Sequence, residues 1–265
     1  MSLGWNRDVM TPDGIKIQSL DLVRETASGS FETSDSLRAT LAVIDLNALE
    51  PATSDALINE LFHERELARR DGFVHARRKD SYSFGRLASK LALRAHLPDH
   101  DPRVISIESG VFEQPILSCS EGAAVETLGV SISHSDQLAA ALIYHRGHPM
   151  GIDVDLPSAV DIDPVFDGLD AKTRVLCDEL GLSKHDTASL LWVAQESLAK
   201  TLTTGMMTPL DIYAASEISR HGDGFVLGYR NFAQYRTYVW PGILGWLAIT
   251  LPARTSFKNM GPDWS

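Results

Sequence analysis

The sequence predicts an α+β fold made of two similar halves that meet near residue 150. A helix-rich stretch followed by several strand-like segments occurs twice along the 265 residues. The two strongest helix patterns, "GRLASKLAL" at 85–93 and "WVAQESLAK" at 192–200, occupy corresponding places in this order. With 44% hydrophobic and 22% charged residues, the chain has the composition of a globular protein with a real core.

The first elements follow a polar beginning. Residues 1–40 are polar and irregular, and we expect a loop or a mobile leader there. The stretch "LAVIDLNAL" at 41–49 is apolar and β-branched enough to be a first strand. Residues 54–70 then have helical spacing, with Ser54 as the expected N-cap.

The middle of the chain continues with a helix and several strands. Residues 84–97 predict a helix, because leucines recur on one face and Pro98 stops it. A strand is expected in 101–109. The stretches 129–145 and 151–156 are typical of strands interrupted by a loop or a short helical start.

The second half repeats the order of helices and then strands. We expect helices in 173–182 and 187–205 and strands in 210–219, 224–230, 236–240 and 243–251. The predicted organisation is a leader at 1–40, an N-terminal lobe at 41–150, a C-terminal lobe at 151–252 and a tail at 253–265.

Cysteine usage and hydropathy indicate where the protein works. Cys119 and Cys177 form neither a disulfide framework nor a CxxC pair, so we expect a reducing, cytoplasmic environment and no structural zinc. No apolar run approaches the roughly 20 residues of a membrane span, and the N-terminus lacks a signal-peptide layout. Membrane partners are therefore not expected.

Charge is distributed unevenly along the chain. The formal net charge of -11 argues against a nucleic-acid partner, because non-specific binding needs a broad cationic surface. Residues 65–94, however, hold nine Arg and Lys residues against three acidic ones. This basic block is typical either of a confined site for a polyanionic ligand or of a solvated helix face.

Two carboxylates stand out in "GIDVDLPS" at 151–158. Asp153 and Asp155 are two positions apart on an expected strand, so they project from the same face and repel each other. A divalent cation would remove the repulsion, and hard oxygen ligands suit Mg²⁺. A cluster of basic groups, or a strand end that has reached water, would also explain the pair.

The second strong helix offers a third carboxylate. Glu196 and Lys200 are four residues apart and therefore share a helix face. Alone, they read as a surface ion pair. Together with Asp153 and Asp155, Glu196 would complete a set of three metal ligands.

These residues occur in motifs that resemble the 4'-phosphopantetheinyl transferase superfamily of the two-lobed, pseudo-dimeric type. The family pattern is a G-[IV]-D-x-[DE] strand, followed at about this distance by W-x-x-K-E-[AS]-x-x-K on a helix. "GIDVD" matches the first motif, and Trp192, Glu196, Ser197 and Lys200 match the second. "SISHS" at 131–135, "RRKDSYSFGRLASKLAL" at 77–93 and "KTLTTGMMTPLD" at 200–211 are also similar to family segments.

The resemblance implies a function as well as a fold. Such enzymes are transferases that use Mg²⁺ to move the 4'-phosphopantetheine arm of coenzyme A to a serine of an acyl or peptidyl carrier protein, and they release adenosine 3',5'-bisphosphate. Carriers of this kind serve fatty acid, polyketide or peptide biosynthesis, and the sequence does not identify which. The implied protein is a monomer with coenzyme A between its lobes.

The family's functional residues carry over by position. The metal ligands would be Asp153, Asp155 and Glu196, and the catalytic residues would be Glu196, Lys200 and Asp153. The residues that bind coenzyme A would be Ser133, His134 and Lys200 together with three arginines of the basic block, Arg77, Arg78 and Arg86.

Two positions depart from the family pattern. Gln195 replaces the lysine before the metal-binding glutamate, and Gln114 replaces a lysine of a G-K-P-x-L segment. Two phosphate-facing cations are thus missing. The two substitutions leave open a second interpretation: the protein is a non-catalytic module that keeps the fold and binds coenzyme A or a carrier protein. An unrelated metal-dependent hydrolase would need a nucleophile or a two-metal cluster that the sequence does not offer.

Overall fold

Two antiparallel sheets form the centre of the computed structural model, which describes residues 12–25, 31–119, 125–155, 159–167, 169–205, 208–242, 245–259 and 261–264. The first sheet has the order β12-β1-β2-β6-β5, with β1 Ile15–Glu25, β2 Phe31–Asp45, β5 Leu128–His134, β6 Leu138–His145 and β12 Thr255–Phe257. The second has the order β7-β11-β10-β9-β8, with β7 Gly151–Asp155, β8 Ala215–His221, β9 Gly224–Tyr229, β10 Tyr235–Gly242 and β11 Gly245–Pro252. A separate ribbon pairs β3 Ile105–Ser109 with β4 Pro115–Cys119.

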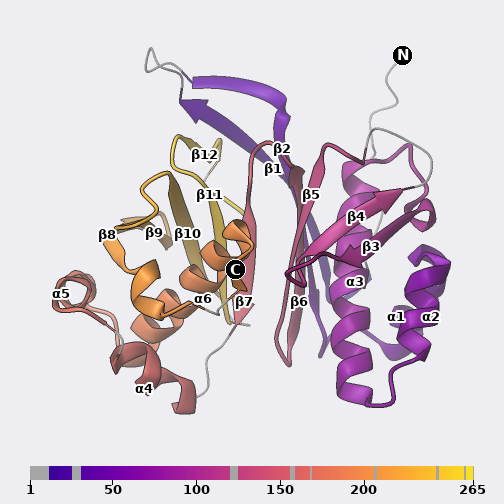
Figure 1. The fold of residues 1–265 in the computed structure, drawn as a ribbon, viewed down its shortest axis with the longest axis horizontal. Helices are drawn as coiled ribbons and strands as arrows, with labels where there is room; N and C mark the ends of the chain where they lie inside the picture. The colour runs from indigo at the N-terminus through magenta and orange to yellow at the C-terminus, as the bar shows by residue number, and fades with distance from the viewer. Residues whose placement is uncertain are drawn as a thin grey trace.

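Helices cover the outer face of each sheet, as Figure 1 shows. On the first sheet lie α1 Pro51–Leu61, α2 Glu64–Asp71 and α3 Ala76–His96, and on the second lie α4 Ala159–Asp167, α5 Ala171–Leu180 and α6 Lys184–Leu202. Two short 3₁₀ helices, η1 Pro102–Val104 and η3 Leu210–Tyr213, precede β3 and β8. Each sheet therefore has one long helix, α3 or α6, against it, which confirms the predicted α+β class.

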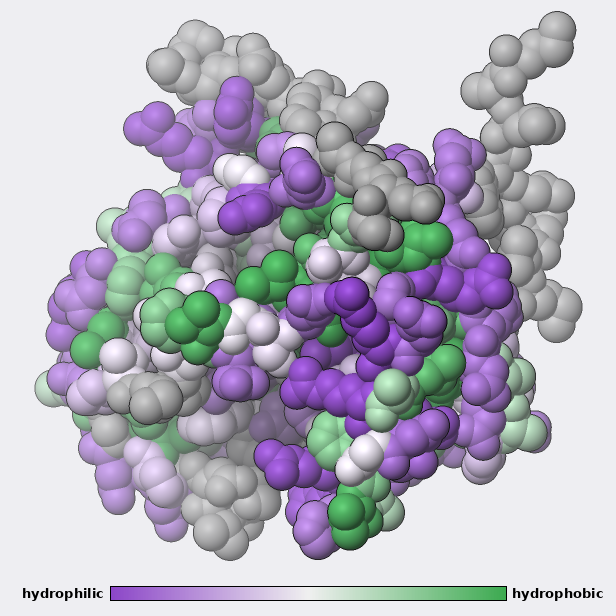
Figure 2. All heavy atoms as spheres, turned by 45° about the vertical axis from the view of Figure 1, so that its right-hand side comes forward, coloured by the Kyte–Doolittle hydropathy of each residue, from purple (hydrophilic) through white to green (hydrophobic). Residues whose placement is uncertain are grey.

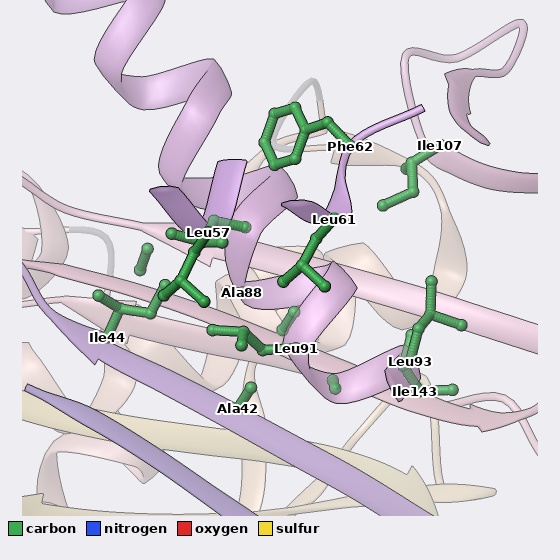
Figure 3. Packing of buried hydrophobic residues seen from close by; sticks show 14 of the residues in the cluster. Ala42, Ile44, Leu57, Leu61, Phe62, Ala88, Leu91, Leu93, Ile107 and Ile143 are labelled. Carbon is green, nitrogen blue, oxygen red and sulfur yellow. The ribbon is translucent and has the colours of Figure 1, made fainter. Parts of the chain in front are cut away.

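Apolar side chains fill the spaces between these layers. Between the sheets, buried residues of β2, β6, β7 and β11 form one cluster, which includes Leu41, Leu142, Ile152, Leu247 and Ile249. A second cluster lies between the first sheet and its helices, where Figure 3 shows Leu57, Leu61, Ala88 and Leu91 against Ala42, Ile44 and Ile143. Burying each leucine contributes about 1.5–3 kcal/mol, so the two interfaces hold the layers in register.

The prediction of an irregular leader over residues 1–40 is wrong for the part that the structure describes from residue 15 onward. Residues 15–25 form β1, which pairs along its length with β2, and β2 itself begins at residue 31. Ile15, Leu20 and Leu22 face the core, but the polar residues between them hide this pattern in the sequence. Residues 1–11 and 26–30 lie outside the described residues.

The C-terminal tail predicted at 253–265 also belongs to the fold. Residues 255–257 form β12, which pairs with β1, so the chain returns from the second sheet to the edge of the first. At its far end, the backbone of Asp263 forms two hydrogen bonds of 2.8 Å with the side-chain amide of Gln18. Contacts between residues so far apart in the sequence form only in the folded chain, so the local sequence does not indicate them.

The helix expected in 54–70 is two helices. It begins earlier, at Pro51 after Glu50, and Ser54 lies inside α1, where its hydroxyl donates to the Pro51 carbonyl instead of capping. The chain then breaks at His63, which caps α2. The other predicted helices are confirmed with shifted ends, as α3, α5 and α6, whereas α4 and β4 were not predicted.

In the part of the chain that the structure describes, no helix combines the length and the apolar character needed to cross a membrane.

Candidate functional site

The site begins with a close approach between α6 and β7. Gly151 lies directly under the helix: a Cβ at this position would come within 2.3 Å of the Ser197 carbonyl oxygen and 2.4 Å of Thr201 Oγ1. The Ser197 hydroxyl donates to the Gly151 carbonyl at 3.0 Å and accepts from the Thr250 amide at 3.0 Å. These contacts fix α6 across β7 and β11. The side chains on the face of α6 that is turned toward these strands therefore reach the end of β7.

Asp153 is the most buried carboxylate of this site, with only 4% of its surface exposed. Its Oδ1 accepts hydrogen bonds from Lys200 Nζ at 2.6 Å and from Ser133 Oγ at 2.7 Å. Its Oδ2 is also buried, but it has no hydrogen-bond partner among the described residues. An unpaired carboxylate oxygen is costly to bury, so Oδ2 is available for a further ligand.

Ser133 joins the two sheets at this point. Its hydroxyl donates to Asp153 and accepts from the Val154 amide at 3.2 Å, and Ser131 accepts from the Ile152 amide in the same way at 3.1 Å. The outward amides of β7 are thus satisfied by serines of β5. The sequence suggests Ser133 as a contact of coenzyme A, but here its one donor proton is used on Asp153 and the residue is buried.

Replacing Ser133 by alanine is expected to destabilise the protein by about 1.5–3 kcal/mol, because a hydrogen bond to a buried charge and a buried amide partner are lost together. Urea unfolding would measure the change. The matched control is Ser131→Ala, which loses the amide contact but none to a charge and should cost about 0.5–1.5 kcal/mol. Equal losses for the two variants would contradict the proposed support of Asp153.

Glu196 lies on the same face of α6 as Lys200 and is partly buried. Burial and the neighbouring Asp153 raise its pKa to about 7, Asp155 adds to the increase, and the ammonium of Lys200 opposes it. The three carboxylates predicted as metal ligands are therefore electrostatic neighbours. Asp155 in turn accepts a hydrogen bond from Trp192 Nε1 at 3.2 Å, so Trp192, Glu196 and Lys200, spaced by four, all face β7.

The structure also allows a test of whether these residues fit a metal ion. No group of three His, Cys, Asp or Glu side chains in the described ranges is already arranged to hold one. The donor set nevertheless suits a hard cation, because the free Oδ2 of Asp153 and the Glu196 carboxylate are oxygen ligands in need of positive charge. We conclude that the residues fit Mg²⁺ in kind and would need side-chain adjustment to coordinate it.

His134 follows Ser133 at the end of β5, where its Nε2 contacts the hydroxyl of Ser81 on α3. Partial burial and the nearby Lys200 ammonium lower its pKa, against the smaller opposite effects of Asp153 and Asp136. The imidazole is therefore neutral at pH 7. The ring lies within the electrostatic reach of Asp153 and Lys200, and its predicted contact with coenzyme A stays a prediction.

Most of the basic block is neutralised by ion pairs. Six of its nine cations contact an acidic side chain, in the pairs Arg65–Glu108, Arg70–Asp55, Arg77–Asp136, Lys79–Asp71, Lys90–Glu66 and Arg94–Glu60. Figure 2 shows hydrophilic side chains over much of the face that includes this side of the molecule. Most of the positive charge of the block is thus compensated by neighbouring carboxylates, at exposed positions such as Arg65 and Arg77 and at one buried position, Lys90.

The three predicted arginines occupy different surroundings. Arg77 is exposed and pairs with Asp136 at 2.9 Å, beside the turn that follows His134. Arg78 is exposed and has no ion pair with any described residue. Arg86 lies over the Tyr82 ring, 4.9 Å from its centre, with its Nε buried and unpaired among the described residues. Among the contacts of the described residues, only that of Arg77 places a predicted arginine next to the His134 end of β5.

The two departures from the family pattern have local explanations. Gln195 is buried on α6, and its Oε1 has no partner among the described residues. Gln114 closes the turn between β3 and β4, where its Oε1 accepts from the Phe112 amide at 2.8 Å. Neither side chain forms a hydrogen bond with a described residue of the carboxylate cluster, and a neutral amide does not replace a missing cation.

The sequence did not reveal the role of Ser81, nor the hydrogen bonds that the motif residues Ser197 and Trp192 form. For Trp192, the spacing of four to Glu196 and Lys200 was an available signal, since it places all three on one helix face. Ser81 gave no local signal, because its partner is 53 residues away.

Comparison with known proteins gives limited similarity. No model of a known protein family matches the sequence, and no curated protein matches it. Among solved structures, the chain is similar to a holo-(acyl-carrier-protein) synthase from Bacillus anthracis str. Ames in complex with CoA (3',5'-ADP). The sequences are 23% identical, the match covers 39% of this chain and 90% of that one, and the TM-score is 0.33.

Proposed function

We propose that this protein is an Mg²⁺-dependent transferase that moves the 4'-phosphopantetheine arm of coenzyme A to a serine of an acyl or peptidyl carrier protein. The observation that carries the proposal is the state of Asp153. One of its oxygens is fixed by Lys200 and Ser133, and the other is buried without a partner among the described residues, near a second carboxylate whose pKa is raised to about 7. This combination suits a site that receives a cation and a phosphate.

The reaction assigns a task to each side chain. The carrier serine oxygen attacks the β-phosphorus of coenzyme A, the bond from this phosphorus to the bridging oxygen breaks, and adenosine 3',5'-bisphosphate leaves. Glu196 would accept the serine proton: burial and Asp153 raise its pKa to about 7 in the metal-free protein, and a bound cation would favour its ionised, proton-accepting form. A bound Mg²⁺, held by Asp153, Asp155 and Glu196, would neutralise negative charge that develops on the phosphates. Lys200 adds a fixed positive charge beside them.

The carrier protein would dock beside the start of α3. Carriers are generally acidic and this chain has a net charge of -11, so attraction must come from a local patch. Val74 is 92% exposed, and Arg78 is exposed without an ion pair to any described residue. Arg78 lies one helical turn before Ser81 on α3, and Val74 lies two residues before the start of this helix. Ser81 in turn contacts His134 at the proposed site.

Intact-mass measurement of apo carrier proteins, incubated with this protein, coenzyme A and Mg²⁺, tests the function. We expect a gain of one phosphopantetheine arm on at least one carrier, and no gain with Glu196→Ala. If no carrier in a fatty-acid, polyketide and peptide panel gains mass, the transferase proposal fails. Binding of coenzyme A in calorimetry would then favour the non-catalytic module, which the replacement of two family lysines by Gln195 and Gln114 also favours.

A further inference from the structure

Helix α3 runs antiparallel to β5, and one face of the helix lies along this strand and the turn that follows it. Arg77 pairs with Asp136, Ser81 contacts His134, and a Cβ on Gly85 would lie 3.1 Å from the Ile132 side chain. These contacts recur every four residues on the helix and every two on the strand, so this line of contacts fixes the helix against the strand. His134 is thereby held from the side of α3.

Among the described residues, only one nitrogen of the His134 ring has a hydrogen-bond partner. Nε2 contacts the Ser81 hydroxyl, whereas Nδ1 has no hydrogen-bond partner among the described residues. A neutral imidazole carries its single proton on one of the two nitrogens. If the hydroxyl donates to Nε2, the proton must be on Nδ1, and the free nitrogen is then a donor.

The surroundings favour a neutral donor over a charged one. The groups that act electrostatically on His134 are Lys200, Asp153 and Asp136, and Lys200 opposes protonation of the ring. A second cation beside Lys200 would cost repulsion in the protein without ligand. A neutral ring with the proton on Nδ1 supplies a hydrogen bond to an anion without that cost.

We propose that Ser81 is a positioning residue that donates its hydroxyl proton to Nε2 of His134 and so directs the ring proton to Nδ1, from where it binds a phosphate of the ligand. The identity of this ligand as coenzyme A, and of the phosphate as its 3'-phosphate, rests on the proposed function. The state of the ring does not. Ser81 itself does not touch the ligand, and its effect acts through His134.

Nitrogen-15 NMR of the His134 ring, in the full-length protein above its pKa, tests the assignment directly. We expect the Nδ1–H tautomer in the wild type, its loss in Ser81→Ala and its retention in Ser81→Thr. The matched control is Ser83→Ala on the same helix, because the Ser83 hydroxyl bonds to the Lys79 carbonyl and to Arg70 and should leave the His134 signals unchanged. An Nε2–H tautomer in the wild type, or an unchanged tautomer in Ser81→Ala, would overturn the proposal.

Calorimetry separates this inference from the proposed function. We expect Ser81→Ala to weaken the binding of coenzyme A roughly threefold to tenfold, the size of one neutral hydrogen bond, and to leave 3'-dephospho-coenzyme A unaffected. If neither compound binds the wild type, the coenzyme is the wrong ligand, while the NMR result still decides the role of Ser81. An equal loss for both compounds would show that Ser81 does not act through the 3'-phosphate.

Discussion

Replacing Glu196 by glutamine is expected to lower the rate of arm transfer by a factor of about 10²–10⁴, the usual contribution of a positioned general base. Glutamine has nearly the same shape but cannot accept the serine proton and is a poorer ligand for Mg²⁺. The rate of mass gain on the carrier that responds best would measure the effect. A loss of less than about tenfold would remove Glu196 from the chemistry.

The same carboxylate predicts the pH dependence of the reaction. Since the pKa of Glu196 in the metal-free protein is raised to about 7, the ionised form becomes dominant only above this pH. At limiting Mg²⁺ the wild-type rate should therefore rise between about pH 6 and pH 8. A rate that is flat over this range at several Mg²⁺ concentrations would contradict the assignment.

Glu196→Gln should lower the rate but raise the stability of the metal-free protein at high pH. Such a result would show that the loss of rate does not come from a damaged fold. A carboxyl whose pKa is raised by folding binds more protons in the folded state, so its ionisation destabilises the protein as pH rises through about 7. Without metal, the variant should be more stable than wild type at pH 8 and similar at pH 4.5. Urea unfolding at the two pH values distinguishes this from damage to the fold.

The parts of the site that follow from local periodicity could be predicted from the sequence. Two residues on a strand share a face, as do residues four apart on a helix, and these rules place Asp153, Asp155, Glu196 and Lys200 correctly on β7 and α6. That the helix approaches the strand closely enough for contact depends on Gly151, which the motif contains. As a result of this close approach, Lys200 Nζ on α6 lies 2.6 Å from Asp153 Oδ1 on β7.

Features that depend on distant partners could not be predicted in the same way. The density of positive charge in residues 65–94 suggests an anion site, but the acidic partners of four of its cations, Asp55, Glu60, Glu108 and Asp136, lie outside this block. The strands β1 and β12 were missed for the same reason. Each gains its place from pairing across the chain, and neither is apolar enough to be recognised alone.

The second large effect is expected in the N-terminal half, at a buried ion pair between α2 and α3. Lys90 has no exposed side-chain surface and its Nζ lies 2.9 Å from Glu66 Oε2. The ammonium also donates to the carbonyls of Pro102 and Ile105, while Glu66 accepts from the amides of His63 and Ile107, both at 2.9 Å. Two side chains thus join two helices, η1 and β3, and their polar groups are well satisfied.

Lys90→Met is therefore expected to destabilise the protein by about 3–5 kcal/mol, because it leaves the Glu66 carboxylate buried without its counter-ion. Arg94→Met is the matched control one turn further along α3: its pair with Glu60 is exposed, so the loss should stay within about 1 kcal/mol. The double variant Glu66→Gln with Lys90→Met should recover part of the loss, because no buried charge remains. Burial is the largest cause that lowers the pKa of Lys90, and Glu66 is the main group that opposes it. A Lys90→Met variant as stable as the control would mean that the pair contributes nothing beyond its own cost of desolvation.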